Sequence, residues 1–293
     1  IYLIIRINKL NKTMVKTAVI TGANRGIGLR VAKNLIDKEF QVILACRSEK
    51  KGLQAEQYLG QGAKFLPLDL SSKSSIEHFS EIVLKEISNI DVLYNNAGLI
   101  YNPYQLTEEG YESMIAVNVY GSFRLSLLLL ENIERAKGKI LQVTSLASYL
   151  ARSFSINNLH SKEDFSPGKR YNLTNLLRSM FALELHNKLQ GRDISIGLVH
   201  PGITKSRQSR PYEVTKIKKS TFTYISTNIQ TGADPVLKAI NDKIVNAEKV
   251  YAPRLFGIYG RPSQHKHNKL VYNSEYRKQL WSHLVEELGL DLW

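Results

Sequence analysis

The sequence predicts a doubly wound α/β fold, in which helices cover both faces of one parallel β-sheet and form three α/β/α layers. Apolar, β-rich runs alternate along the chain with stretches in which apolar residues recur every three or four positions, so strands and helices follow one another. Right-handed crossovers place the helices on both faces of the sheet. With 293 residues, 43% of them hydrophobic, the chain is long enough for a single large domain, expected over residues 14–293.

The expected elements run in order from the first strand to the last. Strands are predicted at residues 17–20, 41–46, 64–68, 91–95, 139–144 and 194–199. Helical periodicity begins near residues 27, 50, 74, 106 and 171 and fills the gaps between strands. No internal repeat, low-complexity tract or linker interrupts the pattern, which indicates one domain.

Three glycines follow the first predicted strand, in the stretch Val19-Ile-Thr-Gly-Ala-Asn-Arg-Gly-Ile-Gly28. Gly22 lets the chain turn sharply, Gly26 leaves room for a pyrophosphate against bare backbone, and Gly28 lets the next helix lie close to the strand. The N-terminus of that helix then faces the anion. A strand, a glycine-rich turn and a helix in this order favour a Rossmann-type dinucleotide site over a turn that merely ends a strand.

The residues after the second predicted strand favour NADP(H) over NAD(H). Arg47 stands where an acidic residue would bind the ribose of NAD, and Arg25 in the first turn points toward the same region. Two arginines suit the 2′-phosphate of NADP, although two ordinary surface arginines are the alternative interpretation.

Two polar segments follow the third and fourth predicted strands. Asp69 either accepts a hydrogen bond from the adenine amino group or caps the helix that begins near Ser71. The fourth strand ends in small and polar residues, where the carboxyl end of a strand meets a ligand crevice; these are Asn95, Asn96, Ala97 and Gly98. A turn of the Asn-Gly type has the same composition.

Composition limits the compartment. Cys46 is the only cysteine, so no internal disulfide forms and a reducing intracellular compartment, cytoplasmic or mitochondrial, is expected. Its apolar neighbours predict a buried small residue. No apolar run approaches the ~20 residues of a membrane span. Residues 1–13, before Met14, form an N-terminal extension with three basic and no acidic residues, as in an organellar presequence, a membrane-surface helix or a disordered arm.

The net charge of +14 is concentrated in the last third of the chain, where residues 201–278 contain 15 Lys or Arg against five Asp or Glu. We expect the segment 204–278 to dock onto a larger protein assembly or an anionic surface, because its basic clusters are interleaved with aromatic residues. These residues are Lys216, Lys218, Lys219, Arg261, His265, Lys266, His267 and Lys269, with Tyr224, Tyr251, Phe256 and Tyr259. A solvated face or a lid over an anionic substrate are the alternatives, and no nucleic-acid-binding motif accompanies the charge.

Together these residues resemble the short-chain dehydrogenase/reductase family, and within it the branch of the retinol dehydrogenases and the WW-domain oxidoreductase, over nearly the whole chain from Val15. The resemblance implies catalytic positions at Ser145, Tyr171 and Asn118. It also implies a substrate lid around residues 203–230, a C-terminal helix around 274–289 and a homodimer through the helices around Asn118 and Tyr171. We expect no metal site. The implied cofactor contacts are Gly22, Asn24, Arg25, Gly26, Ile27, Gly28, Arg47, Asp69, Leu70, Asn96, Ala97, Gly98, Pro201 and Gly202.

The chain departs from this family at one catalytic position. The family has Tyr-x-x-x-Lys after the serine strand, whereas this chain has Asn175 four residues after Tyr171. In the family the tyrosine hydroxyl exchanges a proton with the substrate oxygen, and the lysine charge favours the phenolate and holds the ribose. Asn175 can hydrogen-bond but brings no charge, so dehydrogenation, which needs the phenolate, is the handicapped direction.

Other cations near Tyr171 are candidates for the missing charge. Arg178 lies one further turn along the same helix face, and Lys169 and Arg170 precede Tyr171. Residues 212–216 also spell Tyr-x-x-x-Lys, but they fall in the expected lid, and we interpret this match as coincidence. The alternative interpretation, in which no cation compensates, is that Ser145 and Tyr171 are retained only as hydrogen-bonding elements of the fold.

Two functions therefore stay open. The first is an NADP(H)-binding protein with a degraded active site, a catalytically impaired or non-catalytic subunit that docks through its basic C-terminal third. The second is an active NADP-dependent oxidoreductase, a retinol dehydrogenase-like carbonyl reductase or alcohol dehydrogenase with a lipophilic substrate. The missing lysine favours the first function, and the intact glycine turn, Ser145 and Tyr171 favour the second.

Overall fold

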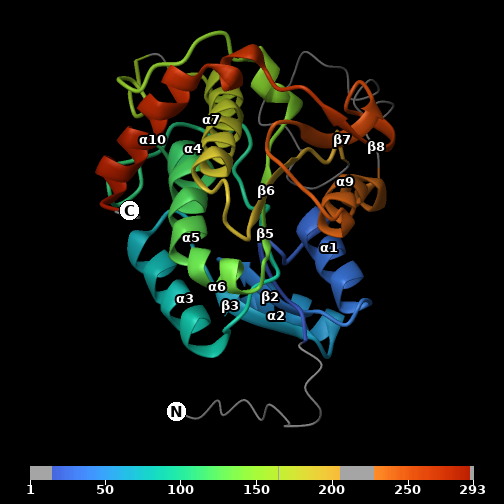
Figure 1. Ribbon diagram of the computed structural model, residues 1–293. Helices are drawn as coiled ribbons and strands as arrows, with labels where there is room; N and C mark the ends of the chain where they lie inside the picture. The colour runs from blue at the N-terminus through green and yellow to red at the C-terminus, as the bar shows by residue number, and fades with distance from the viewer. Residues whose placement is uncertain (1–14, 164, 205–227, 291–293) are drawn as a thin grey trace.

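A computed structural model of the chain describes residues 15–163, 165–204 and 228–290. It confirms the predicted doubly wound α/β fold, with an eight-stranded sheet between two layers of helices (Figure 1). The N-terminal extension and most of the expected lid lie outside the described residues. The same holds for the part of the basic segment that contains Lys216, Lys218, Lys219 and Tyr224.

Seven strands of the sheet are parallel and the last one is antiparallel. The strands lie in the order β3-β2-β1-β4-β5-β6-β7-β8. Their bounds are β1 Thr17–Thr21, β2 Gln41–Cys46, β3 Ala63–Pro67, β4 Val92–Asn95, β5 Lys139–Val143, β6 Ser195–Val199, β7 Val250–Leu255 and β8 Tyr259–His265. The strand order reverses between β1 and β4, and the carboxyl ends of the strands at such a reversal form the crevice in which α/β proteins bind ligands.

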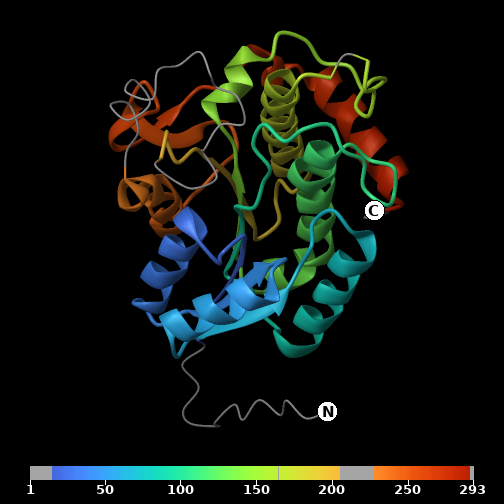
Figure 2. The same cartoon turned by 180° about the vertical axis from the view of Figure 1, so that it is seen from behind.

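The helices divide between the two faces of the sheet, as Figures 1 and 2 show from opposite sides. One layer contains α1 Gly26–Ile36, α2 Glu49–Leu59 and α9 Ile229–Asn241. The other layer contains α3 Lys73–Glu86, α4 Ser113–Ile115, the π-helix η1 Ala116–Gly121, α5 Ser122–Leu128, α6 Leu130–Arg135, α7 Pro167–Lys188 and α10 Ser274–Leu288. The described part of the chain also contains the 3-10 helices η2 Leu146–Leu150 and η4 Lys269–Tyr272.

Alternating side chains of the strands build two separate cores. In β1, Ala18 and Ile20 pack into the core under α1 and α9, whereas Val19 packs into the core under α3, α5 and α7. This alternation is the period of two that a strand requires when both of its faces are covered. The free Cys46 is buried at the end of β2, as its apolar neighbours predicted, and burial raises the pKa of its thiol to about 11.

Two strands and one helix boundary differ from the sequence prediction. The hairpin β7–β8 was not predicted, because Pro253 and Pro262 interrupt both strands and proline is a weak strand former; the two prolines face each other at the sheet edge. The helix expected from residue 106 begins at Ser113 instead. Gly110 has a φ of +82°, outside the helical range, and Glu112 caps the helix by accepting two backbone N–H bonds.

The C-terminal helix α10 packs across α5 and α7. The rings of Trp281 and Phe123 meet edge to face at 5.1 Å, and Arg277 Nε donates to Glu184 Oε2 at 3.1 Å in a buried ion pair. Helix α10 therefore covers part of α5 and α7, the helices through which the resemblance implies dimerisation. Among the described residues, no helix combines the length and the apolar character that crossing a membrane requires.

Part of the predicted docking surface is buried. Tyr251 in β7 has no exposed surface, and the His267 ring bonds to the Ala247 carbonyl at 2.7 Å with 6% of the residue exposed. These two residues belong to the core because they lie at the unpredicted hairpin and its return to α10, so assigning them to the surface was wrong. Phe256, at 88% exposure, and Arg261 do lie on the surface.

Candidate active site

The glycine turn after β1 has the conformation that a pyrophosphate site needs. Gly22 and Gly26 both have positive φ, +65° and +58°. A Cβ at Gly26 would meet no atom within 4 Å, whereas one at Gly28 would lie 2.8 Å from the Gly22 carbonyl oxygen. Helix α1 has no side-chain cap and no acidic residue in its first turn, so its N–H groups are available to an anion. These residues fit a dinucleotide phosphate.

The end of β4 is bonded to this turn. The Asn96 and Ala97 amides donate to Thr21 Oγ1 at 3.0 and 2.9 Å, and Asn96 Nδ2 donates to the Thr21 carbonyl at 2.9 Å. The preceding Asn95 donates from its side chain to Ser126 Oγ at 2.8 Å. The polar segment that ends β4 therefore fixes the glycine turn against the neighbouring strand.

The structure places Arg47 and Asp69 together, on the β2 side of the crevice. Arg47 Nη1 lies 3.7 Å from Asp69 Oδ2, and the Arg47 side chain is 74% exposed. Asp69 Oδ1 accepts bonds from the backbone and hydroxyl of Ser71. Helix α3 is capped by Ser72, so the capping interpretation of Asp69 was wrong. Asp69 keeps its second oxygen for Arg47 or for a bound molecule.

The remaining predicted cofactor residues also line this edge of the sheet. Arg25 is exposed and Asn24 is half-buried in the glycine turn, while Ile27 faces Gly232 of α9. Leu70 is buried below Gly121. Pro201 and Gly202 are half-buried after β6.

Ser145 and Tyr171 come from two elements that pack together, the start of η2 and the first turns of α7. Ser145 Oγ accepts a bond from the Ala147 amide at 3.2 Å. The Tyr171 ring is half-buried, with its centroid 5.0 Å from that of Tyr101. Asn175 is 1% exposed, and its amide donates to the Tyr171 carbonyl at 2.8 Å. Asn175 therefore binds its own helix.

Asn118 lies within the π-helix η1, and π-helical turns are frequent at functional sites. Its side chain exchanges bonds with the Leu99 backbone at 2.7 and 3.0 Å and donates to Thr174 Oγ1 at 3.1 Å. Its backbone carbonyl accepts a 2.7 Å bond from Arg178 Nε. Asn118 thus connects the loop after β4 to helix α7.

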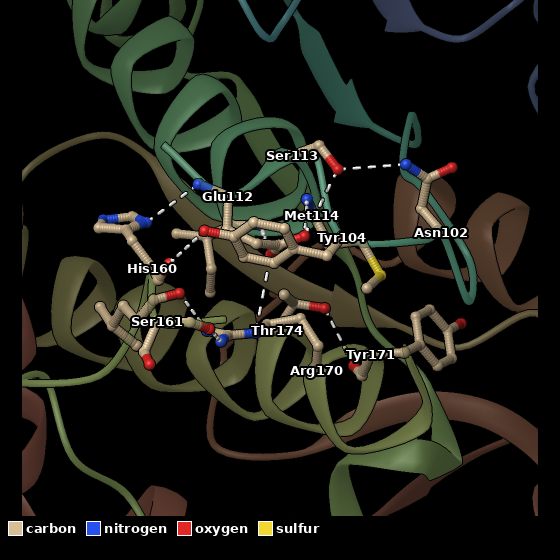
Figure 3. Close-up of polar contacts among 12 residues, drawn as sticks. Asn102, Tyr104, Glu112, Ser113, Met114, His160, Ser161, Arg170, Tyr171 and Thr174 are labelled. Atoms are coloured by element: carbon tan, nitrogen blue, oxygen red, sulfur yellow. Dashed lines mark hydrogen bonds and ion pairs between the residues drawn. The ribbon is translucent and has the colours of Figure 1, made fainter. Parts of the chain in front are cut away.

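A buried polar network that was not predicted anchors the start of α7 (Figure 3). Glu112, with no exposed surface, lies 3.7 Å from Arg170 Nε, and its amide donates to His160 Nδ1 at 3.1 Å. Tyr104 donates to the His160 carbonyl at 3.0 Å. The Tyr171 ring points away from this network. The network therefore positions the helix and leaves the Tyr171 hydroxyl for other partners.

A small cavity beside Ser145 is lined by Tyr149, His200, Ala252 and His265, among others. His200 is 4% exposed, and burial lowers the pKa of its imidazole to about 4. The imidazole is therefore neutral near pH 7. Among the described residues, no group of three or more His, Cys, Asp or Glu side chains is arranged to hold a metal ion.

The buried His200 predicts a loss of stability in acid. Its pKa is about 6.5 in the unfolded chain and about 4 in the folded protein, so only the unfolded state binds the proton between these values. We expect the free energy of unfolding to fall by up to about 3 kcal/mol from this residue as the pH drops from about 6.5 to 4. Urea unfolding at several pH values measures this loss. His200→Gln should remove it, and His78→Gln, at an exposed histidine of α3, should not; equal pH dependence of all three proteins would contradict the prediction.

The comparisons with known proteins agree with this arrangement. The family model for short chain dehydrogenases matches residues 16–158. Human retinol dehydrogenase 11 is 36% identical over 228 residues, which cover 76% of this chain and 71% of the relative. An uncharacterised protein of Mycobacterium paratuberculosis has a similar crystal structure, with a TM-score of 0.80, 28% identity and 95% of each chain covered.

A second solved structure carries a nicotinamide cofactor. It is an alcohol dehydrogenase from Thermococcus sibiricus in complex with 5-hydroxy-NADP, with a TM-score of 0.59 and 26% identity, covering 79% of this chain and 94% of that one. The sheet order, the glycine turn and the match to a retinol dehydrogenase identify this chain as a member of the short-chain dehydrogenase/reductase family, in its retinol dehydrogenase-like branch.

Proposed function

We propose that this protein is an NADP(H)-dependent oxidoreductase that interconverts a carbonyl group and an alcohol on a lipophilic molecule. One observation carries the proposal: the glycine turn, Ser145 and Tyr171 lie at the same carboxyl edge of the sheet. The turn follows β1, and Ser145 follows β5 and packs with α7. A dinucleotide site and two side-chain hydroxyls at the same edge suit hydride transfer, because the cofactor can then lie beside groups that bind and protonate a carbonyl oxygen.

Each side chain has a role that its chemistry permits. Bound NADPH supplies the hydride when it is present. Tyr171 is the acid that gives its hydroxyl proton to the carbonyl oxygen, and Ser145 donates a hydrogen bond to the same oxygen. Asn118 acts indirectly, because its bonds to Leu99 and Thr174 hold the loop after β4 against α7.

The rim of the site supports a lipophilic substrate. The turn between β7 and β8 packs on the site, since a Cβ at Gly257 would meet Leu146 and one at Gly202 would meet the Ile258 carbonyl oxygen. On this turn Leu255 and Phe256 are 56% and 88% exposed. Exposed apolar side chains beside a polar reaction centre suit a ligand with a long apolar part. The similarity to a retinol dehydrogenase also supports a lipophilic substrate.

The direct test is turnover. Purified full-length protein is incubated with NADPH and a panel of aldehydes and ketones that includes a retinoid aldehyde and short polar aldehydes. Consumption of NADPH with apolar substrates, and less with polar ones, supports the proposal. If no substrate is turned over in either direction while NADPH still binds, the oxidoreductase proposal is wrong.

The preference for NADPH is expected to depend on Arg47. Its guanidinium is exposed and can leave Asp69 to pair with a 2′-phosphate, and a charge-assisted bond contributes about 1.5–3 kcal/mol. Arg47→Asp should therefore weaken NADPH binding about 10- to 100-fold relative to NADH in calorimetric titrations. Arg135→Asp, at an exposed arginine of α6 before the amino end of β5, is the control. An unchanged ratio in Arg47→Asp would exclude this role.

A second candidate function is a non-catalytic NADP(H)-binding subunit, which the position of Asn175 favours. The side-chain amide of Asn175 donates to the Tyr171 carbonyl. Asn175 therefore supplies neither the positive charge nor the long side chain of a lysine. Such a subunit would dock through the exposed basic residues of segment 204–278, among them Arg254, Arg261, Lys266 and Lys269. Native size fractionation at low and high salt tests this candidate. A large complex dissolved by salt supports it, and a free monomer or dimer at low salt contradicts it.

A further inference from the structure

Arg178 is a buried cation that lies between the π-helix η1, which contains Asn118, and the end of β4. It is 3% exposed, its Nε donates to the Asn118 carbonyl at 2.7 Å, and its Nη2 donates to the Ala97 carbonyl at 2.6 Å. A Cβ added at Gly98 would lie 2.8 Å from Nη2 and 3.1 Å from Nη1. The guanidinium therefore lies directly over backbone that is expected to contact the cofactor.

Arg178 differs from the other buried arginines because no carboxylate among the described residues neutralises its charge. Arg124, Arg170 and Arg277 each pair with a carboxylate, at 3.1, 3.7 and 3.1 Å. Arg178 pairs with no carboxylate among the residues that the structure describes. An unneutralised buried charge is costly, and such groups concentrate at functional sites. Burial lowers the pKa of the guanidinium to about 10, which leaves it charged at neutral pH.

Three tyrosines form the titratable surroundings of this cation: Tyr171 and Tyr94 interact with it, and Tyr101 packs on Tyr171. Tyr171 lies seven residues before Arg178 and on the same face of α7, and its charge raises the pKa of the guanidinium. Tyr94 of β4 also interacts with Arg178, but full burial raises its pKa, so it stays protonated. Tyr101, in the loop after β4, packs on the Tyr171 ring, and burial raises its pKa too. Of the three, only Tyr171 lies on the same helix as Arg178, and its ring is half-buried rather than fully enclosed.

We propose that Arg178 supplies the charge of the missing lysine, stabilising the Tyr171 phenolate from two turns along α7. The inference rests on the proposed oxidoreductase function. The two bonds to the Asn118 and Ala97 carbonyls hold the guanidinium in place. Arg178 is a positioning residue, because it acts on the reacting atoms through Tyr171.

The proton balance shows which direction depends on the charge. In reduction, the hydride carries two electrons to the carbonyl carbon, the O–H bond of Tyr171 breaks, and its proton moves to the carbonyl oxygen. The phenolate that remains regains a proton from solvent. In oxidation the phenolate takes the proton of the alcohol, so this direction requires Tyr171 to be ionised first. Arg178 itself transfers no proton.

The first test removes the charge. Arg178→Gln should move the alkaline limb of the alcohol oxidation rate upward by about 1 pH unit, the lower end of the effect of an opposite charge, because the two residues are two helical turns apart. The NMR titration of Tyr171 in the free protein, with ¹³C at tyrosine Cζ and Tyr171→Phe to assign the signal, should move in the same direction. Arg178→Lys should stay close to wild type. Arg124→Gln, at a buried arginine of α5, should lower stability and move neither curve.

The second test restores a positive charge at position 175, where the family has its lysine. Asn175→Lys in the Arg178→Gln background should return both curves toward wild type. Asn175→Lys alone should raise the oxidation rate less than about tenfold, because the charge is already present. Unmoved curves in Arg178→Gln, or a gain of about 100-fold or more in Asn175→Lys alone, would overturn the proposal. If wild type shows no turnover, the oxidoreductase function fails, whereas the NMR titration still tests Arg178.

Discussion

Replacing Tyr171 by Phe should lower kcat for carbonyl reduction by about 10² to 10⁴-fold, the contribution of a positioned general acid. Affinity for NADPH should stay within about twofold, because the substitution removes only a hydroxyl that bonds to no protein group among the described residues, and the ring can keep its contact with Tyr101. Steady-state kinetics and NADPH titration measure the two quantities separately.

Tyr104→Phe is the matched control for this experiment. It also removes one tyrosine hydroxyl, but that hydroxyl donates to the His160 carbonyl in the network that anchors α7. It should cost stability, about 1 kcal/mol for one hydrogen bond, with kcat reduced far less than in Tyr171→Phe. Similar kcat values for wild type and Tyr171→Phe would remove Tyr171 from the mechanism.

Replacing Trp281 by Ala should destabilise the protein by about 3–5 kcal/mol, the usual cost of removing a buried aromatic side chain. Trp281 is 6% exposed, packs edge to face on Phe123 at 5.1 Å, and carries Lys188 over its ring at 5.0 Å. The substitution leaves a cavity where α10 meets α5 and α7. Urea unfolding monitored by circular dichroism measures the change.

Phe256→Ala controls for the loss of an aromatic ring as such. Phe256 is 88% exposed, so its removal should change the free energy of unfolding by no more than about 0.5 kcal/mol. A loss below about 1 kcal/mol in Trp281→Ala would mean that α10 does not pack on α5 and α7 as the structure has it.

The parts of the fold that were predicted are those with local signals. The first six strands were found within one residue of their ends, because runs of consecutive apolar residues bounded by polar ones are visible in any short window. The hairpin β7–β8 was missed because a strand that contains Pro253 or Pro262 forms only where a neighbouring strand holds it. The helix start at Ser113 depended on Gly110 and on the cap from Glu112, which a periodicity of apolar residues does not register.

The sequence by itself determined the glycine turn, the doubly wound fold class and the asparagine, not lysine, at position 175, four residues after Tyr171. These features follow from the properties of single residues, such as the freedom of Gly22 and Gly26 to take positive φ, and from the spacing of apolar residues over short stretches. Only the tertiary structure decided where Arg178 lies, because its partners Asn118 and Ala97 are 60 and 81 residues away in the chain. They meet when β4, η1 and α7 pack together, and a buried charge acquires its chemistry from the groups that packing brings to it.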